Sequence, residues 1–352
     1  MNARTSVAPA PPPEEVDVTP LLQALYSGAS LDAAQAEAVF AALVAGELDD
    51  VSTAAMLIAL RLKGETPDEL AGAARALRAA DADFPRPDYL FADSCGTGGD
   101  GSGSINVSTA VAFVAAACGL PVAKHGNRSI SSRCGSADVL ERLGAKIDVP
   151  ADVSRRALDE TGICFLFAPR YHPGLRHAGP VRRTLKVRTI MNILGPCVNP
   201  AEPQVQLLGV FDPALVAPVA QTLAALGVEK ALVVHGGGLD EVAIHAETIA
   251  VRVTAGRVQP CTITPEEAGL ERQPLAGLEG GGPEENADRL ASLLQGYGLG
   301  VESDMVALNA GALLQTAGLS ANLREGVAMA REAMGSGEAY RRLKLFAEAT
   351  HG

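Results

Sequence analysis

The chain is poor in aromatic residues, and its cysteines lack the spacing of a metal site or a disulfide framework. Only 4% of the 352 residues are aromatic, tryptophan is absent, and the six cysteines include no C-x-x-C pair. Cysteines scattered through a long chain are typical of buried, reduced thiols. We therefore expect neither disulfides nor a zinc site.

The chain also lacks an excess of positive charge and any apolar run of membrane-spanning length. The formal net charge of −12 argues against general binding to nucleic acid or anionic lipid, since both favour a basic surface. The N-terminus has prolines and acids where a signal peptide needs an apolar core. We expect a cytoplasmic protein without a membrane span, with a loose, disordered proline-rich tail over residues 1–18.

Three familiar catalytic motifs are missing as well. The sequence contains no G-x-S-x-G elbow, no H-E-x-x-H pair and no Walker A lysine. Serine hydrolase, zinc protease and P-loop chemistry are therefore not expected. A hydrophobic content of 47% with many alanines nevertheless predicts a folded, globular enzyme.

Helical periodicity runs from residue 19 to residue 84 and predicts a small all-helical unit. Thr66 and Glu69 form a capping box around Pro67, and Gly46 and Gly64 lie where two helices should end. The apolar faces of these helices need a partner surface, in this chain or in another subunit.

After Pro85 and Pro87, short β-rich runs alternate with helical stretches, which predicts an α/β domain with a parallel sheet. The candidate strands are residues 89–93, 121–124, 145–149, 163–168, 205–211 and 231–235. Ligands of such sheets bind beyond the carboxyl ends of the strands. The polar motifs of the sequence fall in those places.

The first motif, CGTGGDGSGSINVST, follows a candidate strand and leads into a helix. Its glycines allow backbone N–H groups to crowd around an anion at the helix N-terminus. Gly96, Gly98 and Gly101 also have dinucleotide-fold spacing, but no acid follows about twenty residues later to hold a ribose. Asp100 suits a sugar hydroxyl, an amine or a metal better than a bare pyrophosphate.

A glycine-rich turn without a ligand is the alternative interpretation of this motif. The turn is followed by an unusual number of hydroxyl and amide side chains, which favour a ligand. They belong to Ser104, Asn106, Ser108 and Thr109.

The second motif, KHGNRSISSRCGSADVLERLG, begins at Lys124. No acid occurs between Asp100 and Asp138, although 41 of the 352 residues are acidic. In an acidic protein, such a stretch favours an anionic ligand, although Lys124 or His125 alone would be an ordinary surface or structural residue. The segment from Ser136 is predicted to start a helix whose N–H groups add to phosphate binding.

The third motif, APRYHPGLRHAGPVRRTLKVRTIMNILGP, lies in a second acid-free window and is rich in arginine. Nucleic-acid binding is one interpretation, but few aromatic residues are interleaved for base stacking. An arginine reserved for a carboxylate is another, because the planar guanidinium matches that group bidentately.

In the fourth motif, VVHGGGLDEVAIHAET, a candidate strand ends in glycines that precede Asp240 and Glu241. Adjacent carboxylates at such a turn can reach Mg²⁺, which is usually held by one or two carboxylates and by substrate phosphates. A solvent-facing acid pair is the equally weighted alternative.

Taken together, GTGGDG, KHGNRS, SSRCGSADVLERLG, RYHPGLRHAGPVRRTLKVRT, NILGP and GLDE resemble the anthranilate phosphoribosyltransferases of tryptophan biosynthesis. The resemblance implies transfer of a phosphoribosyl group from phosphoribosyl pyrophosphate (PRPP) to anthranilate. It also implies a helical domain over residues 19–87, joined by helices around 170–190, and an α/β domain over residues 88–168 and 191–352. Homodimers would form through the helical domain.

The same resemblance assigns roles to individual residues. PRPP would be bound by Gly96, Gly98, Gly99, Asp100, Ser104, Asn106, Ser108, Thr109, Lys124 and Ser136. Anthranilate would be bound by Gly96, His125, Asn127, His172 and Arg182, with Arg182 on the carboxylate. Ser108, Asp240 and Glu241 would hold about two Mg²⁺ ions. The candidate catalytic residues are Lys124, Asp240 and Glu241.

Two other functions remain open from the sequence. A nucleoside phosphorylase with the same two-domain architecture would release a base with phosphate instead of joining an amine to the sugar. A non-catalytic relative would use the basic windows for nucleic acid, although Arg182, Asp240, Glu241 and the overall acidity argue against it.

Overall fold

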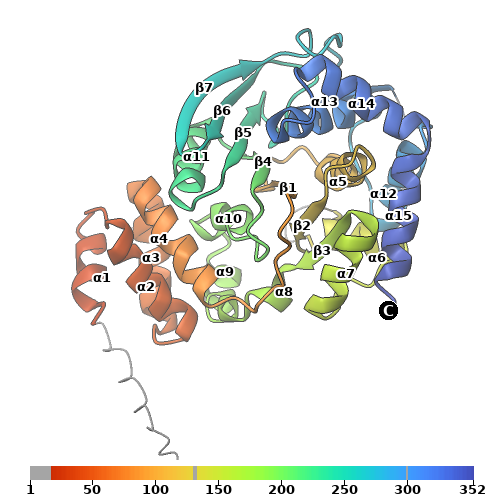
Figure 1. Cartoon of the computed structure of the whole chain (residues 1–352). Helices are drawn as coiled ribbons and strands as arrows, with labels where there is room; N and C mark the ends of the chain where they lie inside the picture. The colour runs from red at the N-terminus through yellow and green to blue at the C-terminus, as the bar shows by residue number, and fades with distance from the viewer. Residues whose placement is uncertain (1–16, 130–132, 299) are drawn as a thin grey trace, which may run out of the picture.

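The computed structural model describes residues 17–129, 133–298 and 300–352, and shows a helical bundle beside an α/β domain (Figure 1). The predicted proline-rich tail lies outside the described residues, apart from its last two positions. Within these ranges no helix is both long and apolar enough to cross a lipid bilayer. The helices of the bundle are α1 (Thr19–Tyr26), α2 (Ala33–Ala45), α3 (Asp50–Lys63) and α4 (Pro67–Ala79).

Local signals in the sequence set the bounds of the bundle helices. At the start of α4, the Thr66 hydroxyl accepts the Glu69 N–H and the Glu69 carboxylate accepts the Thr66 N–H, which confirms the predicted capping box. Gly46 and Gly64 follow the last residues of α2 and α3, as predicted, and both have positive φ.

The apolar faces of the bundle are covered largely within the same chain. Val39 and Phe40 of α2 and Met56 of α3 are at most 1% exposed and share one core. Val181 of α9 (Gly179–Leu185) belongs to that core, and α9 contacts α3. The segment after the third strand therefore returns to the bundle, as Figure 1 shows.

The α/β domain is built on a seven-stranded sheet in the order β3-β2-β1-β4-β5-β6-β7. Neighbouring strands from β3 to β5 are parallel, whereas β6 and β7 add an antiparallel hairpin at one edge. The bounds are β1 (Ala92–Gly96), β2 (Val122–Gly126), β3 (Ile163–Phe167), β4 (Val205–Gly209), β5 (Lys230–Gly236), β6 (Thr248–Thr254) and β7 (Arg257–Ile263). The prediction of a mainly parallel sheet beside a helical unit is confirmed.

One predicted strand is wrong and one pair of strands was not predicted. Residues 145–149 form no strand, because the Lys146 N–H donates to the Thr350 hydroxyl near the C-terminus and not to a neighbouring strand. Their buried and exposed residues alternate only because the extended segment packs on the core. The β6–β7 hairpin turns at Ala255 and Gly256, which both have positive φ.

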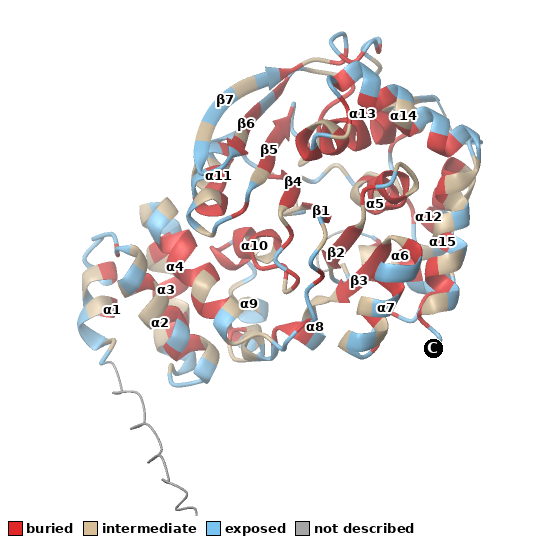
Figure 2. Cartoon of the chain, in the orientation of Figure 1, coloured by how far each residue is buried: buried red, intermediate tan, exposed pale blue. Residues whose placement is uncertain are grey.

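Helices cover both faces of the sheet, so β1 to β5 are buried on both sides (Figure 2). One face packs on α5 (Val107–Ala117) and α13 (Gly300–Ala317), and the other packs on α11 (Val216–Ala225) and the bundle. The remaining helices are α6 (Ser136–Arg142), α7 (Ala151–Thr161), α8 (Ala168–Tyr171), α10 (Met191–Leu194), α12 (Pro283–Leu294), α14 (Leu323–Gly335) and α15 (Glu338–Ala349). Short 3-10 turns span Pro173–Arg176, Gly195–Cys197 and Pro213–Leu215.

The strand order reverses between β1 and β4. From β1 the chain crosses through α5 to β2 on one side, and from β4 it crosses through α11 to β5 on the other. The loops that leave these two neighbouring strands therefore diverge, and open α/β sheets bind ligands beyond the carboxyl ends of strands at such a point.

Glu69 gives a test of how the bundle is held together. It is 0% exposed, its carboxylate accepts the N–H groups of Leu31 and Thr66, and it pairs with Lys63 at 2.8 Å. We expect Glu69→Ala to lower the free energy of unfolding by about 2–4 kcal/mol, because these buried donors lose their acceptor.

Urea unfolding followed by circular dichroism measures the loss, with Glu37→Ala as the control. Glu37 also pairs with a basic residue, Arg75, but it is 43% exposed and should contribute less than about 1 kcal/mol. Equal losses in the two variants would contradict the expectation.

Candidate functional site

The glycine-rich loop after β1 lies at the point where the strand order reverses. Gly98, Gly99, Gly101 and Gly103 have φ between 61° and 81°, a left-handed conformation that glycine adopts without a steric penalty. Helix α5 begins at Val107, directly after the loop. The N–H groups of the loop and of the helix start are therefore gathered at one end of the sheet, where they suit an anion.

A segment from much later in the chain braces the back of this loop. The Gly280 N–H donates to the Gly103 carbonyl over 2.7 Å, and Ser104 forms a β-bridge with Glu279. Asn286 accepts the Gly281 N–H and donates to the Asn106 side-chain oxygen over 3.0 Å. Asn286 was not predicted, because GGGPEEN has only the local pattern of a helix start.

Asp240 and Glu241 follow β5 and lie against the glycine loop. The Gly98 N–H donates to Asp240 Oδ2 over 2.7 Å, although the two residues are 142 positions apart. The Ser108 N–H donates to the Glu241 carboxylate. The first and fourth motifs of the sequence therefore meet in one place.

Two strands leave room for Asp240 by ending in glycine. Gly96 of β1 is paired with Gly209 of β4. A Cβ at Gly96 would overlap the Asp240 carboxylate, and a Cβ at Gly209 would overlap the Asp240 backbone oxygen. A larger residue at either position would displace Asp240. Gly209 was not predicted, because it has the pattern of an ordinary strand residue in the sequence.

Negative charge is concentrated around this contact. Burial and then the charge of Asp100 raise the pKa of Asp240 to about 7. Burial and then the charge of Asp240 raise the pKa of Glu241 well above its ordinary range, while Lys124 opposes that shift. Asp100 itself accepts the Ser102 N–H and lies 3.5 Å from the Asp240 nitrogen. A bound cation would relieve this repulsion.

The available donor atoms suit Mg²⁺. The carboxylates of Asp240 and Glu241 and the hydroxyl of Ser108 are hard oxygen ligands. In the part of the chain that the structure describes, no cluster of three or more His, Cys, Asp or Glu residues could hold a metal ion. Mg²⁺ usually takes one or two carboxylates and completes its shell with water and substrate phosphates. The site therefore fits an ion that binds together with a phosphorylated substrate.

Lys124 connects β2 to the start of α5. Its Nζ donates to the Ser94 carbonyl over 2.6 Å and to the Ser108 hydroxyl over 3.1 Å. Lys124 is 3% exposed, so its charge is held within the protein beside the acids. Thr109 is 1% exposed, and its hydroxyl has no hydrogen bond to any described residue.

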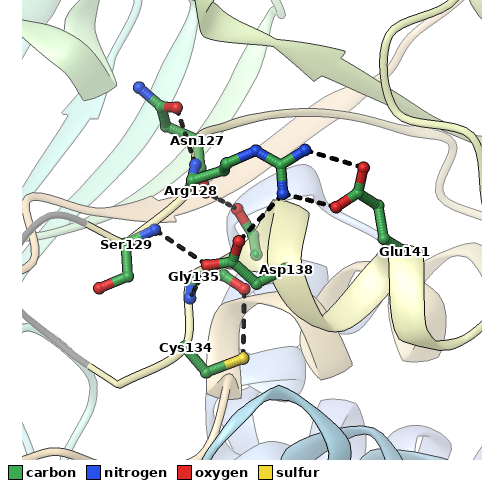
Figure 3. Close-up of polar contacts among 8 residues, drawn as sticks. Asn127, Arg128, Ser129, Cys134, Gly135, Asp138 and Glu141 are labelled. Carbon is green, nitrogen blue, oxygen red and sulfur yellow. Dashed lines mark hydrogen bonds and ion pairs between the residues drawn. The ribbon is translucent and has the colours of Figure 1, made fainter.

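Figure 3 shows the hydrogen bonds and ion pairs that join the segment after β2 to helix α6. Asp138 of α6 accepts the N–H groups of Ser129, over 3.0 Å, and Gly135, over 2.9 Å. Arg128 forms ion pairs with Asp138 and with Glu141. The guanidinium of the KHGNR motif is therefore engaged by α6.

The same segment places Asn127 next to Ser136. The Ser136 hydroxyl donates to the Asn127 carbonyl over 3.3 Å, and Ser136 is the first residue of α6, as predicted. These residues were predicted for different substrates, so their contact would lie between the two substrate positions.

His125 and His172 also contact each other. Their Nε2 atoms are 2.9 Å apart, and the residues are 7% and 5% exposed. On its other side, His172 Nδ1 contacts Asp81, which lies in the linker between α4 and β1. Asp81 was not predicted, because an acid after a helix is usually solvated.

Arg182 of α9 is half-buried, and burial lowers the pKa of its guanidinium. Its side chain has no hydrogen bond or ion pair with the described residues. A half-buried guanidinium without a carboxylate partner is suited to an anionic ligand.

Arg188 was not predicted either, although it lies in the third motif. Its guanidinium donates to the Gly99 carbonyl and lies 4.3 Å from the centre of the Phe211 ring. Its own carbonyl accepts a hydrogen bond from Arg61 of α3. Arg188 therefore links the glycine loop to the helical bundle.

Two family models match the chain in the order of its two structural parts. The helical bundle domain of the glycosyl transferase family matches residues 19–80, and the a/b domain of that family matches residues 88–340. The fold and the acid-and-glycine site at the strand reversal therefore define a glycosyl transferase of this family.

Individual relatives show which family of glycosyl transferases the chain belongs to. Anthranilate phosphoribosyltransferase of Sorangium cellulosum is 60% identical over 326 residues, which are 93% of this chain and 94% of that protein. The structure of the Thermus thermophilus enzyme has a TM-score of 0.90 at 46% identity, covering 96% of this chain and 100% of that one. The Saccharomyces cerevisiae enzyme in complex with PRPP and Mg has a TM-score of 0.86 at 28% identity, covering 95% and 98%. The chain belongs to the anthranilate phosphoribosyltransferase family, which confirms the resemblance seen in the motifs.

The raised pKa of Asp240 predicts how stability changes with pH. The folded protein keeps a proton up to about pH 7, whereas an unfolded aspartate loses it near pH 4. The stabilisation that comes from the proton bound to Asp240 is complete below about pH 4 and is lost as the pH rises through about 7. We expect Asp240→Asn to reduce that loss by about 2–4 kcal/mol in the absence of Mg²⁺.

Urea unfolding between about pH 4 and about pH 7 measures this effect. Asp288→Asn is the control, because Asp288 is an exposed acid of α12 outside the site. If Asp240→Asn has the same pH dependence as the wild type, the pKa of Asp240 is not raised in the folded protein.

Proposed function

We propose that this enzyme transfers the phosphoribosyl group of PRPP to the amine of anthranilate. The products would be N-(5-phosphoribosyl)anthranilate and pyrophosphate, a step of tryptophan biosynthesis. The observation that carries the proposal is the contact of Gly98 with Asp240 where the strand order reverses. Family membership at 60% identity over 93% of the chain supports the choice of anthranilate as acceptor.

The PRPP half of the site would lie around the glycine loop. The left-handed glycines gather N–H groups at the start of α5 that would face an anion, and Lys124 adds a positive charge there. The side chains and backbone that would bind PRPP are those of Gly96, Gly98, Gly99, Asp100, Ser104, Asn106, Ser108, Thr109, Lys124 and Ser136.

Asp240, Glu241 and Ser108 would hold Mg²⁺, and about two ions per subunit is our prediction. When bound, Mg²⁺ would supply the charge neutralisation that the departing diphosphate requires. Loss of pyrophosphate leaves an oxocarbenium-like sugar, so the residues must stabilise the leaving group more than they activate the nucleophile. Lys124 and the loop N–H groups would do this for the diphosphate oxygens.

The anthranilate half of the site would involve His125, Asn127, His172 and Arg182. Arg182 would bind the carboxylate, since its guanidinium is half-buried and not engaged by a described acid. The aniline nitrogen is neutral at pH 7, so the enzyme needs no strong general base. Holding that nitrogen against the anomeric carbon would provide most of the remaining acceleration.

Two other functions are compatible with the sequence, a nucleoside phosphorylase and a nucleic-acid-binding protein, and the relatives favour neither of them. A nucleoside phosphorylase would require phosphate and a nucleoside, whereas the relatives at 60% and 54% identity are anthranilate phosphoribosyltransferases. A nucleic-acid-binding relative would need a basic groove, but Arg128, from the acid-free window, is paired with Asp138 and Glu141.

Loss of anthranilate fluorescence on addition of PRPP and Mg²⁺ tests the proposed reaction. We expect turnover by the wild type, and a KM for anthranilate about 10- to 100-fold higher in Arg182→Ala, because a charge-assisted bidentate contact is lost. The control is Arg183→Ala, the exposed neighbour in α9, which should stay within about twofold of the wild type.

The variant Asp240→Asn Glu241→Gln tests the metal assignment in the same assay. We expect its kcat to fall by at least about 100-fold, because the ligands that hold the charge-neutralising ion are lost. Wild-type turnover in that variant would disprove the assignment. No turnover by the wild type itself would disprove the proposed function.

We also propose that the protein is cytoplasmic and that its subunits form a homodimer through the helical domain. The boundary between the helical domain and the α/β domain would lie near residue 87. Support for the dimer comes from large apolar side chains exposed on the bundle, with Val51 78% and Leu62 80% exposed. Leu62 also lines a groove of about 480 Å³. Its lining residues include Leu25, Tyr26, Ala55, Ile58, Ala59 and Leu62.

Substitution of this apolar surface tests the dimer. We expect Leu62→Arg to shift the protein from dimer to monomer in light scattering coupled to gel filtration, because an apolar contact would be replaced by a charge. Tyr297→Arg, at a 79% exposed position outside the bundle, should leave the mass unchanged. A monomeric wild type would contradict the proposal.

A further inference from the structure

A chain of three side chains joins the interdomain linker to β2. Asp81 Oδ1 contacts His172 Nδ1, and His172 Nε2 lies 2.9 Å from His125 Nε2. The side chains of Asp81 and His172 are only 8% and 2% exposed. Asp81 Oδ2 is buried and has no hydrogen-bond partner among the described residues, so His172 is the main contact of this carboxylate.

The hydrogen bond between the two histidine rings has a defined donor and a defined acceptor. Two ring nitrogens this close share one proton, so one ring donates and the other accepts. The backbone of Gly195 hydrogen-bonds the His125 ring and raises its pKa, which is the effect of a carbonyl that accepts a ring N–H. Because His172 occupies Nε2 of His125, that N–H belongs to Nδ1.

His125 is therefore the acceptor in the pair. Burial and then the charge of His172 lower the pKa of His125 well below its ordinary value, so the ring is neutral and carries one N–H. That proton is on Nδ1, which leaves the lone pair of Nε2 facing His172. His172 must donate its Nε2–H to His125.

Asp81 makes this arrangement possible. With its proton on Nε2, His172 can meet Asp81 as an imidazolium that donates to a carboxylate, or as a neutral ring that accepts from a carboxylic acid. Burial raises the pKa of Asp81, and the contact with His172 lowers it. In both cases one proton lies between Asp81 and Nδ1, and the proton on Nε2 stays in place.

We propose that Asp81 is a positioning residue for the aromatic-acid half of the site. By holding Nδ1 of His172, it fixes the His172 ring and its Nε2–H, which in turn holds the His125 ring next to Lys124. The proposal rests on the proposed function, which places anthranilate beside these histidines.

The geometry defines what the histidines offer to a ligand. The two rings are 4.8 Å apart with an interplanar angle of 75°, an edge-to-face arrangement. Their ring nitrogens are engaged by Asp81, by each other and by Gly195. The pair would therefore offer an aromatic ring only the small part of its ring surface that is exposed, in a fixed orientation, and would leave binding of the carboxylate to other groups such as Arg182.

Steady-state kinetics of Asp81→Ala, Asp81→Asn and Asp83→Ala test the proposal. We expect Asp81→Ala to raise the KM for anthranilate about tenfold, with the KM for PRPP within about twofold. Asp81→Asn should restore most of the loss, because its amide N–H can donate to Nδ1 and keep the proton of His172 on Nε2. Asp83→Ala is the matched control, an exposed acid of the same linker that should behave as the wild type.

Nitrogen-15 NMR of labelled histidine provides a measurement that a purely structural role would not change. In the wild type, we expect Nε2 protonated in His172 and unprotonated in His125. Asp81→Ala should disturb this pattern, and Asp81→Asn should preserve it. A wild-type spectrum with the opposite assignment would overturn the proposal.

The outcomes separate this proposal from the proposed function. If the wild type turns over anthranilate but Asp81→Ala behaves as Asp83→Ala, or raises both KM values equally, Asp81 is not a positioning residue for anthranilate. If the wild type has no turnover, the proposed function fails first. If Asp81→Ala does not fold by circular dichroism, the protonation of His172 and His125 in the wild-type NMR spectrum decides between the two outcomes.

Discussion

The hydrogen bond from the Gly98 N–H to the Asp240 carboxylate is the contact on which the site depends. It requires Asp240 to enter the space between the ends of β1 and β4, where only glycines at positions 96 and 209 leave room. It also buries a carboxylate beside Asp100 and Glu241, which raises the pKa of Asp240 and Glu241. Such repulsion destabilises the folded protein, and the proposed site for a cation and a polyanionic substrate would explain why it is retained.

The fold holds this contact in place from several directions. Behind the glycine loop, Gly280 and Asn286 bond to Gly103 and Asn106. From the side of the bundle, Arg188 bonds to Gly99, and Arg61 bonds to Arg188. A loop of glycines has little conformational preference of its own, so these braces set its geometry. The helical bundle is therefore connected to the glycine loop, the proposed site of phosphate binding, as well as to the proposed acceptor side.

The sequence predicted the features that are encoded locally. The capping box at Thr66 and the helix start at Ser136 depend on neighbouring residues, and the structure has both. The strand predicted at residues 145–149 failed because alternating burial does not provide a pairing partner. Gly209 and Asp81 were missed because their importance comes from contacts with residues far away in the chain. No local pattern distinguishes such residues from an ordinary strand glycine or a solvated acid.

The two halves of the proposed site differ in how they use buried polar groups. At the end of β5, Asp240 and Glu241 lie together beside Lys124, and we propose that cations complete that half. At the end of β2, the ring nitrogens of His125 and His172 are engaged by each other, by Gly195 and by Asp81, so the histidines of that half need no ligand to satisfy them. This difference matches the chemistry, since the diphosphate needs neutralisation while it departs, whereas a neutral amine needs only to be held in place. Polar groups on the acceptor side can therefore act only by positioning other side chains. In this way, a buried acid in the linker can act through a histidine without taking a proton from the substrate.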